Sequence, residues 1–417
     1  MSYSPARLRG CAVVLTAVGT LVAPPVTGAA AVAHPPAATV TADPPAPSPP
    51  ASGDDVRALT PAVTRQLDSA VRRVMRQAGI PGVTVGLWAP GKGQYVRSFG
   101  VADKATGQRM SPDLRMRIGS ETKTFTVTAL LQLADQGRLG LDDTIDRYVG
   151  GVPNGDRITL RQLAGMRSGL FNYSEDDGFF KALTSDPQRP FTPRQLLGYA
   201  FRHPVLFPPG QRFDYSNTNL VLLGLVVEKA GGKPLADYVK DNILDPVGLD
   251  HTLFPAGNEF PEPHAQGYTD QTATGKVEDA ADWNPSWGWA AGAMISDLED
   301  LRVWASTVAT GRLPYGGVLI SPATQKQRLT APPTSIPGAG YGLGIFDVQG
   351  WIGHNGSLPG YESLTVYLPS AKATLVVLLN TDIGHDGQEP STLLGDAITR
   401  IVSPGHVFDL PAEPAAR

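Results

Sequence analysis

One helix is predicted to lie at the centre of this chain, and the rest of the fold has to be arranged around it. The segment from Ser120 to about Gln136 is helical in character, and its apolar side chains occur nearly all the way round the helix. These side chains are Phe125, Val127, Leu130, Leu131 and Leu133. A helix that is apolar on every side must be covered on every side, so we expect it to be buried centrally.

Segments typical of β-strands occur near both ends of the chain, whereas the middle is mostly helical. The predicted strands are 83–88, 95–101, 342–348, 363–368 and 373–379. The clearest helices outside the centre are 61–78, 192–201, 219–230 and 392–402. We therefore predict an α+β fold in which one antiparallel sheet is built from both chain ends and flanked by helices, with an inserted, mostly helical lobe. A cleft is expected between sheet and lobe.

The first 33 residues are typical of a signal peptide. Arg7 and Arg9 precede the apolar stretch Ala12–Ala23, and Ala31-Val32-Ala33 offers a cleavage site. That stretch is too short to cross a bilayer, so we expect a secreted protein with no membrane span after cleavage. An uncleaved membrane anchor is the alternative.

The remaining chain divides by composition. Residues 34–58 are rich in Pro and Ala and are predicted to form a disordered linker. One folded domain is expected over 59–405, followed by a flexible tail over 406–417. The single cysteine, Cys11, falls in the predicted signal peptide, so the mature chain has no disulfide.

Overall composition excludes several classes of function. A formal net charge of −4 without a basic stripe argues against nucleic acid as a partner. The seven histidines are scattered without metal-ligand spacing, and no Gly-rich phosphate loop is present, so no metal or organic cofactor is expected. The absence of a Gly-x-Ser-x-Gly elbow argues against an α/β-hydrolase. Nothing indicates an obligate interface, and we expect a monomer.

Ser120 and Lys123 stand three residues apart at the start of the central helix. That spacing places two side chains on one helix face, within reach of each other. A buried lysine next to a serine can take the hydroxyl proton and make the serine a nucleophile at neutral pH. The positive end of the helix would also stabilise developing negative charge on Ser120. The alternative is a serine N-cap followed by a solvated lysine.

A second motif, Tyr215-Ser216-Asn217, follows the turn 208–210 and precedes a predicted helix. The Tyr215 phenol is a candidate proton carrier between the serine and a leaving group, assisted by a nearby lysine. The alternative is a core aromatic residue followed by an asparagine that serves a turn or cap.

A third motif, His354-Asn355-Gly356-Ser357, lies on a predicted strand near the C-terminus. Gly356 would let a substrate approach the strand edge. The backbone N–H of Ser357 would join that of Ser120 in an oxyanion hole. The alternative places His354 at the surface or in a turn.

With these three motifs in this order, the chain resembles the serine β-lactamase and penicillin-recognising hydrolase family. The resemblance is strongest to soluble, exported D-alanyl-D-alanine carboxypeptidases with Tyr-x-Asn and His-x-Gly motifs, and it covers about residues 60–402. Connecting stretches that also match are 117–125, 166–170, 209–219 and 286–292. The resemblance implies that Ser120 is acylated, that Lys123 helps to deprotonate it, and that Tyr215 acts as general acid and base. His354 would replace the lysine found in the third motif of many relatives.

The resemblance also implies a set of residues that contact substrate. They are Asn217, Trp287, Asn355, Gly356, Ser357 and Phe346. Among them, Asn217 would hydrogen-bond the side-chain amide of the substrate, and Trp287 would line the cleft. Phe346 stands where the carboxypeptidases carry an arginine that holds the terminal carboxylate, and no arginine occurs between Arg328 and Arg400. Loss of that bond, worth roughly 1.5–3 kcal/mol, weakens the expectation of strict carboxypeptidase activity.

The expected function is therefore an exported serine hydrolase that forms an acyl-Ser120 enzyme. Its preferred substrates would be peptidoglycan-type D-amino-acid peptides, so cell-wall peptidoglycan is a possible partner. An esterase or β-lactamase on the same scaffold is the first alternative, favoured by Phe346. A non-catalytic domain that binds β-lactams or the cell wall is the second.

Overall fold

The computed structural model describes residues 55–410. The predicted signal peptide, most of the predicted linker and residues 411–417 lie outside the described residues. A seven-stranded antiparallel sheet forms one layer, with the strand order β2-β1-β11-β10-β9-β8-β7. Its strands are β1 (Gly82–Ala89), β2 (Gly93–Gly100), β7 (Ala339–Tyr341), β8 (Phe346–Val348), β9 (Trp351–Leu358), β10 (Tyr361–Leu368) and β11 (Ala373–Leu379).

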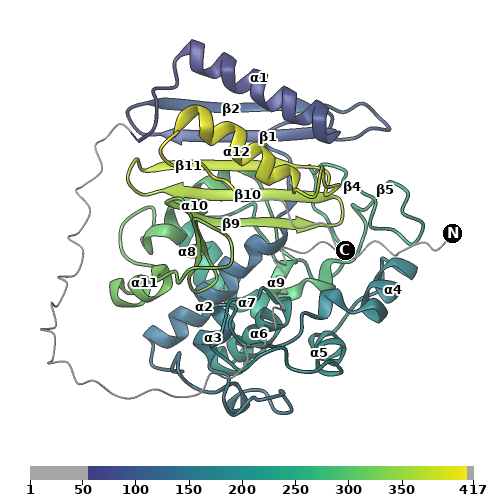
Figure 1. Ribbon diagram of the computed structural model, residues 1–417, viewed down its shortest axis with the longest axis vertical. Coiled ribbons are helices and arrows are strands. Elements are labelled where there is room, and N and C mark those ends of the chain that lie inside the picture. Colours follow the sequence, from purple (N-terminus) through teal and green to yellow (C-terminus); the bar gives the residue numbers. More distant parts are fainter. Residues whose placement is uncertain (1–54, 411–417) are drawn as a thin grey trace, which may run out of the picture.

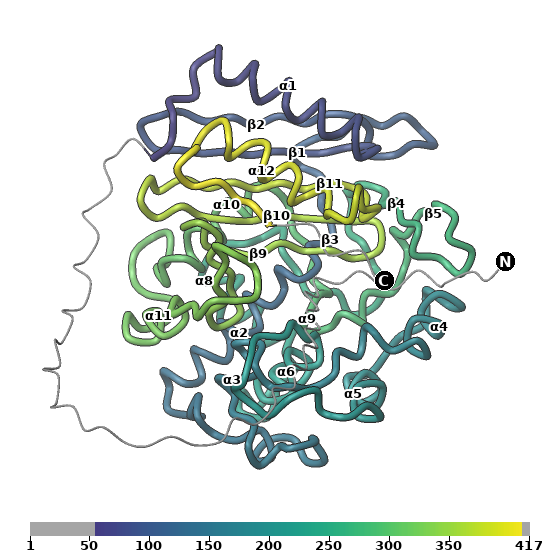
Figure 2. Tube along the Cα trace, in the orientation of Figure 1, coloured from purple at the N-terminus to yellow at the C-terminus, as the bar shows by residue number. Residues whose placement is uncertain are grey.

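Both ends of the chain contribute to this sheet, which confirms the predicted fold class. β1 pairs with β11 from Val83 opposite Leu379 to Trp88 opposite Thr374. Figure 2 shows the purple N-terminal strands beside the yellow-green C-terminal ones. Such pairing between distant segments is specified by the alternation of side chains, since a shift of one residue would move every apolar side chain to the opposite face.

Two terminal helices cover one face of the sheet (Figure 1). These are α1 (Pro61–Ala78) and α12 (Pro390–Val402). The start of α1 follows directly from sequence, because the Thr60 side chain accepts a hydrogen bond from the Val63 N–H and Pro61 occupies the first turn. Leu364 of β10 packs on Gly395 of α12. The neighbouring Ser363 bonds the Ile118 carbonyl on the opposite face, where the second layer begins.

The second layer is the inserted helical lobe, drawn in blue to green in Figure 1. Its helices are α2 (Thr122–Asp135), α3 (Leu160–Ala164), α4 (Asp177–Ser185), α5 (Pro193–Phe201), α6 (Asn217–Gly231), α7 (Leu235–Val239), α8 (Asp245–Val247), α9 (Trp289–Gly292), α10 (Leu298–Thr310) and α11 (Pro322–Leu329). Four short strands add two small ladders, β3 (Met116–Arg117) with β6 (Ile295–Ser296) and β4 (Tyr268–Thr269) with β5 (Glu278–Asp279).

Helix α2 is central, as predicted. Every residue from Thr122 to Leu133 is buried. On one side Phe125 stacks on Trp304 of α10 at 4.0 Å, and on others α2 contacts α6 and α9. One detail differs from the prediction, because Ser120 precedes α2 in a 3-10 turn, Gly119–Glu121, and is not part of the α-helix itself.

Three predicted boundaries are wrong. Only Phe346–Val348 of the strand expected over 342–348 is a strand, because Gly342 and Ile345 close a turn with Gly344 at φ +65°. The linker does not extend to residue 58, since Val56 is buried and the Arg57 N–H donates to the Val402 carbonyl. Nor is the chain a free tail from residue 406, since Phe408 is buried and the His406 carbonyl accepts from Trp351. These end segments close over the terminal helices, and composition alone does not reveal such docking.

Within residues 55–410, no helix combines the length and apolar character that crossing a membrane requires.

Candidate active site

The turn Gly119–Glu121 brings Ser120 against the sheet. Gly119 has φ +52°, and a Cβ added there would lie 2.6 Å from the backbone nitrogen of Ser357. Only glycine accepts both the left-handed conformation and this close approach. The main chain before the nucleophile is thus packed directly on β9, and Ser120 itself is only 7 % exposed. The predicted oxyanion partners, the N–H groups of Ser120 and Ser357, belong to these two adjoining segments.

Lys123 and Ser120 are joined by a hydrogen bond. Lys123 is fully buried, and its Nζ donates to Ser120 Oγ and to the Ala291 carbonyl, both at 2.8 Å. The alternative of a serine cap and a solvated lysine is wrong, because no side chain caps this helix start and the amine is not in solvent. A buried amine fixed on a serine oxygen is suited to activate that oxygen as a nucleophile.

Tyr215 lies beside the same lysine. The Lys123 Nζ is 4.9 Å from the centre of the Tyr215 ring, and the tyrosine is 2 % exposed just before α6. Its ring also packs edge-on against Tyr341 and lies 6.2 Å, centre to centre, from His354. The three motifs, separated by up to 234 residues in sequence, therefore meet around one group of side chains.

His354 is a buried, neutral member of this group. Its Nδ1 lies 2.5 Å from the Asn355 carbonyl, which can only accept, so the proton sits on Nδ1. Nε2 is then free to accept from the Tyr341 hydroxyl at 3.3 Å. Burial, together with the charge of Lys123, lowers the His354 pKa to about 3. The imidazole thus contributes no positive charge, unlike the lysine that stands in the third motif of many relatives.

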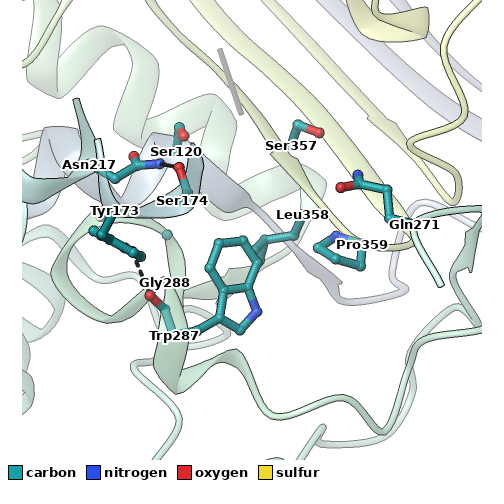
Figure 3. A pocket seen from close by; sticks show the side chains of 12 residues that line it. Ser120, Tyr173, Ser174, Asn217, Gln271, Trp287, Gly288, Ser357, Leu358 and Pro359 are labelled. Carbon is teal, nitrogen blue, oxygen red and sulfur yellow. Dashed lines mark hydrogen bonds between the residues drawn. The ribbon is translucent and has the colours of Figure 1, made fainter. Parts of the chain in front are cut away.

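A pocket opens beside Ser120 (Figure 3). It is bounded by the turn of the nucleophile, the start of α6, the segment before α9 and the end of β9. Its lining residues are Ser120, Tyr173, Ser174, Asn217, Gln271, Trp287, Gly288, Ala291, Gly292, Ser357, Leu358 and Pro359. The predicted binding residues Asn217, Trp287 and Ser357 are among them. Among the lining residues that were not predicted as site residues, three present polar side chains.

A chain of hydrogen bonds orients Asn217. The Asn172 side-chain nitrogen donates to Glu175, and the Oδ1 of the same asparagine accepts from the Ser174 hydroxyl. The Ser174 oxygen in turn accepts from Asn217 Nδ2 at 3.1 Å. The Asn217 amide nitrogen is thus held by Ser174, and the remaining polar atom of the side chain is Oδ1. That oxygen is buried and has no hydrogen-bond partner within residues 55–410. It is available to accept an N–H from a ligand.

Two predicted binding residues of the third motif serve the fold instead. Asn355 does not line the pocket, because its side chain shares the sheet face of Leu364 and donates to Glu389 at the start of α12. Gly356 does not make room for a substrate, because a Cβ there would lie 2.0 Å from the Ile118 carbonyl. The glycine is required by packing between β9 and the nucleophile turn. Strand alternation could have indicated the direction of Asn355 from sequence.

Phe346 is also absent from the pocket lining. It is buried on β8 in an aromatic cluster, edge-on to Tyr341 at 4.5 Å and 5.0 Å from the His354 ring. It therefore packs against His354 and does not line the pocket beside Ser120. The resemblance to the carboxypeptidases identified the strand of this residue but not the direction of its side chain.

The lining residues with polar side chains that were not predicted from sequence are Tyr173, Ser174 and Gln271. Tyr173 and Ser174 form a short 3-10 turn, and the Tyr173 hydroxyl donates to the Trp287 carbonyl at 2.5 Å. Gln271 lies in the loop between β4 and β5. None of the three belongs to a motif with catalytic spacing, and only the neighbouring Asn172, a residue type favoured in turns, marks the first two.

One further cluster bears on the expectation that no metal is used. His251, Asp297 and Asp300 hold their ligand atoms within 4.8 Å of one another. Both carboxylates already have structural roles: Asp297 caps α10, and Asp300 accepts from the His251 N–H and the Thr252 hydroxyl. These contacts account for the cluster as a helix start.

Fold and site together define a serine hydrolase whose nucleophile is partnered by a lysine. The chain belongs to the Beta-lactamase family, which matches residues 67–397. It is similar to a D-stereospecific amidohydrolase from Streptomyces sp., with 32 % identity and a TM-score of 0.69 over 79 % of this chain and 96 % of that one. It is also similar to the D-amino acid amidase of Ochrobactrum anthropi SV3, with 27 % identity and a TM-score of 0.70 over 82 % and 96 %.

A curated relative is Protein flp of Staphylococcus aureus, with 28 % identity over 77 % of this chain. The matched region spans 64 % of the length of that relative.

Proposed function

We propose that this protein is an exported hydrolase that cleaves amide bonds of D-amino-acid derivatives through an acyl-Ser120 intermediate. The observation that carries the proposal is the 2.8 Å hydrogen bond between buried Lys123 and Ser120, beside a pocket that Ser120 itself lines. Two similar solved structures, named as a D-stereospecific amidohydrolase and a D-amino acid amidase, support this substrate class.

The reaction follows from the arrangement. Ser120 Oγ attacks the substrate carbonyl carbon while its proton passes to the Lys123 amine, which has to enter this step in its neutral form and leaves it as the ammonium. The carbonyl oxygen takes the negative charge and is stabilised by the N–H groups of Ser120 and Ser357. Tyr215, beside Lys123, relays the proton to the leaving nitrogen as the C–N bond breaks. Water then attacks the acyl carbon, gives its proton to the same groups and releases the acid.

The nature of the leaving group is indicated by charge. A D-alanyl-D-alanine carboxypeptidase must hold a terminal carboxylate, which favours a lysine or arginine. No Lys or Arg side chain lines the pocket within residues 55–410, and His354 is neutral. These features favour uncharged leaving groups, so simple amides and internal D-peptide bonds are the preferred substrates and free C-terminal D-alanine a poorer one.

Esterase activity is the second candidate. It is favoured by the same uncharged lining, since no Lys or Arg side chain faces the pocket within residues 55–410. Such a lining suits an alcohol leaving group as well as an amine.

The test has two parts. Labelling with a fluorescent penicillin or a fluorophosphonate, followed by mass spectrometry, is expected to place the adduct on Ser120 in wild type and nowhere in Ser120→Ala. A panel of D-phenylalanine amide, diacetyl-L-Lys-D-Ala-D-Ala, nitrocefin and a p-nitrophenyl ester then separates the activities. We expect the D-amide to be cleaved with the higher kcat/KM of the two amide substrates.

Three outcomes would change the assignment. An unlabelled Ser120 would remove the acyl-enzyme. Efficient ester cleavage without release from either amide would make the protein an esterase. Labelling without turnover of any substrate would make it a β-lactam- or wall-binding domain.

A further inference from the structure

Gln271 presents an unused acceptor to the pocket. It lies in the loop after β4, is 4 % exposed and lines the same pocket as Ser120. Its Oε1 is buried and has no hydrogen-bond partner in the part of the chain described. A buried carboxamide oxygen without a partner is costly, so such an oxygen in a binding pocket indicates a ligand that supplies the missing donor.

The direction of that oxygen is set from behind by Asp382. The Gln271 Nε2 donates to Asp382 Oδ2, which also accepts from the Thr269 hydroxyl at 3.0 Å. The other carboxylate oxygen accepts from the Gly360 N–H at 3.0 Å. Where the Asp382 carboxyl is ionised, a reversed amide would place Oε1 against an acceptor, so the nitrogen stays on Asp382 and the oxygen faces away from it. Figure 3 shows this oxygen turned toward the side on which Ser120 and Trp287 lie.

The opposite side of the pocket repeats the pattern. Asn217 also has its amide nitrogen committed to the protein and its oxygen unpartnered. Trp287 lies between the two in Figure 3 and provides an apolar surface. A ligand that matches this pocket therefore carries N–H donors near the reacting carbonyl, together with an apolar side chain.

We propose that Gln271 is a specificity-determining residue that accepts an N–H from the nitrogen next to the reacting carbonyl in the acyl group. The enzyme then selects aminoacyl or acylaminoacyl donors over plain carboxylic acyl groups. The inference rests on the proposed function and narrows its substrate class. With the carbonyl at Ser120, the nitrogen at Gln271 and the side chain on Trp287, the acyl group is held at three points, which also distinguishes its two enantiomers.

Three p-nitrophenyl esters that share one carbon skeleton test the proposal. They are the esters of D-phenylalanine, N-acetyl-D-phenylalanine and 3-phenylpropanoic acid. Wild type is expected to show a kcat/KM at least about tenfold higher for one or both nitrogen-bearing esters, after subtraction of spontaneous hydrolysis. If the D-phenylalanine ester has the higher kcat/KM of these two, a free ammonium group binds Gln271; if the N-acetyl ester has it, an acylated N–H does.

Variants then assign the preference to one residue. Gln271→Met keeps the length of the side chain but removes the acceptor, and it should lower the preference ratio about tenfold. Gln266 is a nearby glutamine that does not line the pocket. Its replacement, Gln266→Met, is the matched control and should leave the preference ratio unchanged. Asp382→Asn tests the positioning role, because a neutral amide can donate to Oε1 and let Gln271 turn, so the ratio should fall there too. Thermal unfolding of each variant confirms that it is folded.

The results separate this inference from the function on which it rests. Hydrolysis of all three esters without a preference in wild type, or a preference that Gln271→Met leaves intact, overturns the role of Gln271 while the acyl-enzyme stands. An equal slowing of all three esters by Gln271→Met would make the residue a loop support only, which also overturns it. Failure to cleave any ester, with Ser120 unlabelled, removes the proposed function and this inference with it.

Discussion

The two ends of the active site are built in different ways. At the catalytic end, the reacting groups contact one another: Lys123 donates to Ser120, and Tyr215 and His354 pack beside them. At the binding end, Asn217 and Gln271 have their nitrogens occupied by the protein and their oxygens left without partners within residues 55–410. The catalytic end is organised before substrate arrives, whereas the binding end is completed by it.

This difference has a physical basis. Groups that stabilise a transition state are most effective when they need no rearrangement, which requires that the protein hold them in place. Selectivity for a polar substrate arises instead from the penalty of leaving buried acceptors unpaired when the wrong substrate binds. Each end is also backed by a buried acid, Glu121 next to the nucleophile and Asp382 behind Gln271. Burial raises their pKa values to about 8 and about 7.

Removing the amine at the catalytic end should have the largest effect. Lys123→Met keeps the volume of the side chain but abolishes the contact with Ser120, and kcat/KM should fall about a thousandfold or more. Unfolding stability should be maintained or rise, because a buried amine is replaced by an apolar group. Pre-steady-state acylation with a p-nitrophenyl ester measures the loss. The exposed Lys326→Met is the control, and an acylation rate within about tenfold of wild type for Lys123→Met would refute its role.

The acid behind the catalytic end should affect stability in a pH-dependent way. The Glu121 carboxyl lies fully buried against Ser363 and Thr365, whose hydroxyls only partly offset the rise of its pKa from 4.5 to about 8. Between these values the unfolded chain releases a proton that the folded protein keeps. Stability should therefore fall as pH rises through this window, by at most about 1.4 kcal/mol per pH unit, and Glu121→Gln should remove that slope.

Denaturant unfolding of wild type and Glu121→Gln at several pH values between 5 and 8.5 measures this contribution. The difference between the two proteins isolates Glu121 from His354, whose lowered pKa acts in the opposite sense below pH 6.5. The exposed Glu278→Gln serves as control and should follow wild type. Parallel curves for wild type and Glu121→Gln would show that the Glu121 carboxyl is ionised in the folded protein.

The smallest effect is expected at the binding end. Ser174→Ala removes the acceptor that orients the Asn217 amide, at a cost of about 1 kcal/mol. KM for a D-amino-acid amide should rise several-fold, while the acylation rate of a simple p-nitrophenyl ester changes less. Ser185→Ala, an exposed serine at the end of α4, provides the comparison. An equal loss for both substrates would mean that Ser174 supports the nucleophile rather than recognition.

Sequence patterns predicted the elements more reliably than the directions of side chains. The apolar helix after Ser120, the capped start of α1 and the strands at both chain ends follow from periodicity and capping, which act over a few residues. Asn355, Gly356 and Phe346 were predicted to contact substrate, and the structure instead places them against Glu389, the Ile118 carbonyl and Tyr341. A motif match identifies the residue at a position, but the helix, strand or turn packed against that position determines which groups its side chain contacts.

By itself, the sequence predicted the pairing of Ser120 with Lys123, because three residues of helical turn bring them together wherever the helix lies. Only the tertiary structure decided that His354 is neutral and that Gln271 faces the pocket. Burial and hydrogen-bond direction depend on partners far along the chain, and Asp382 lies 111 residues from the amide it holds.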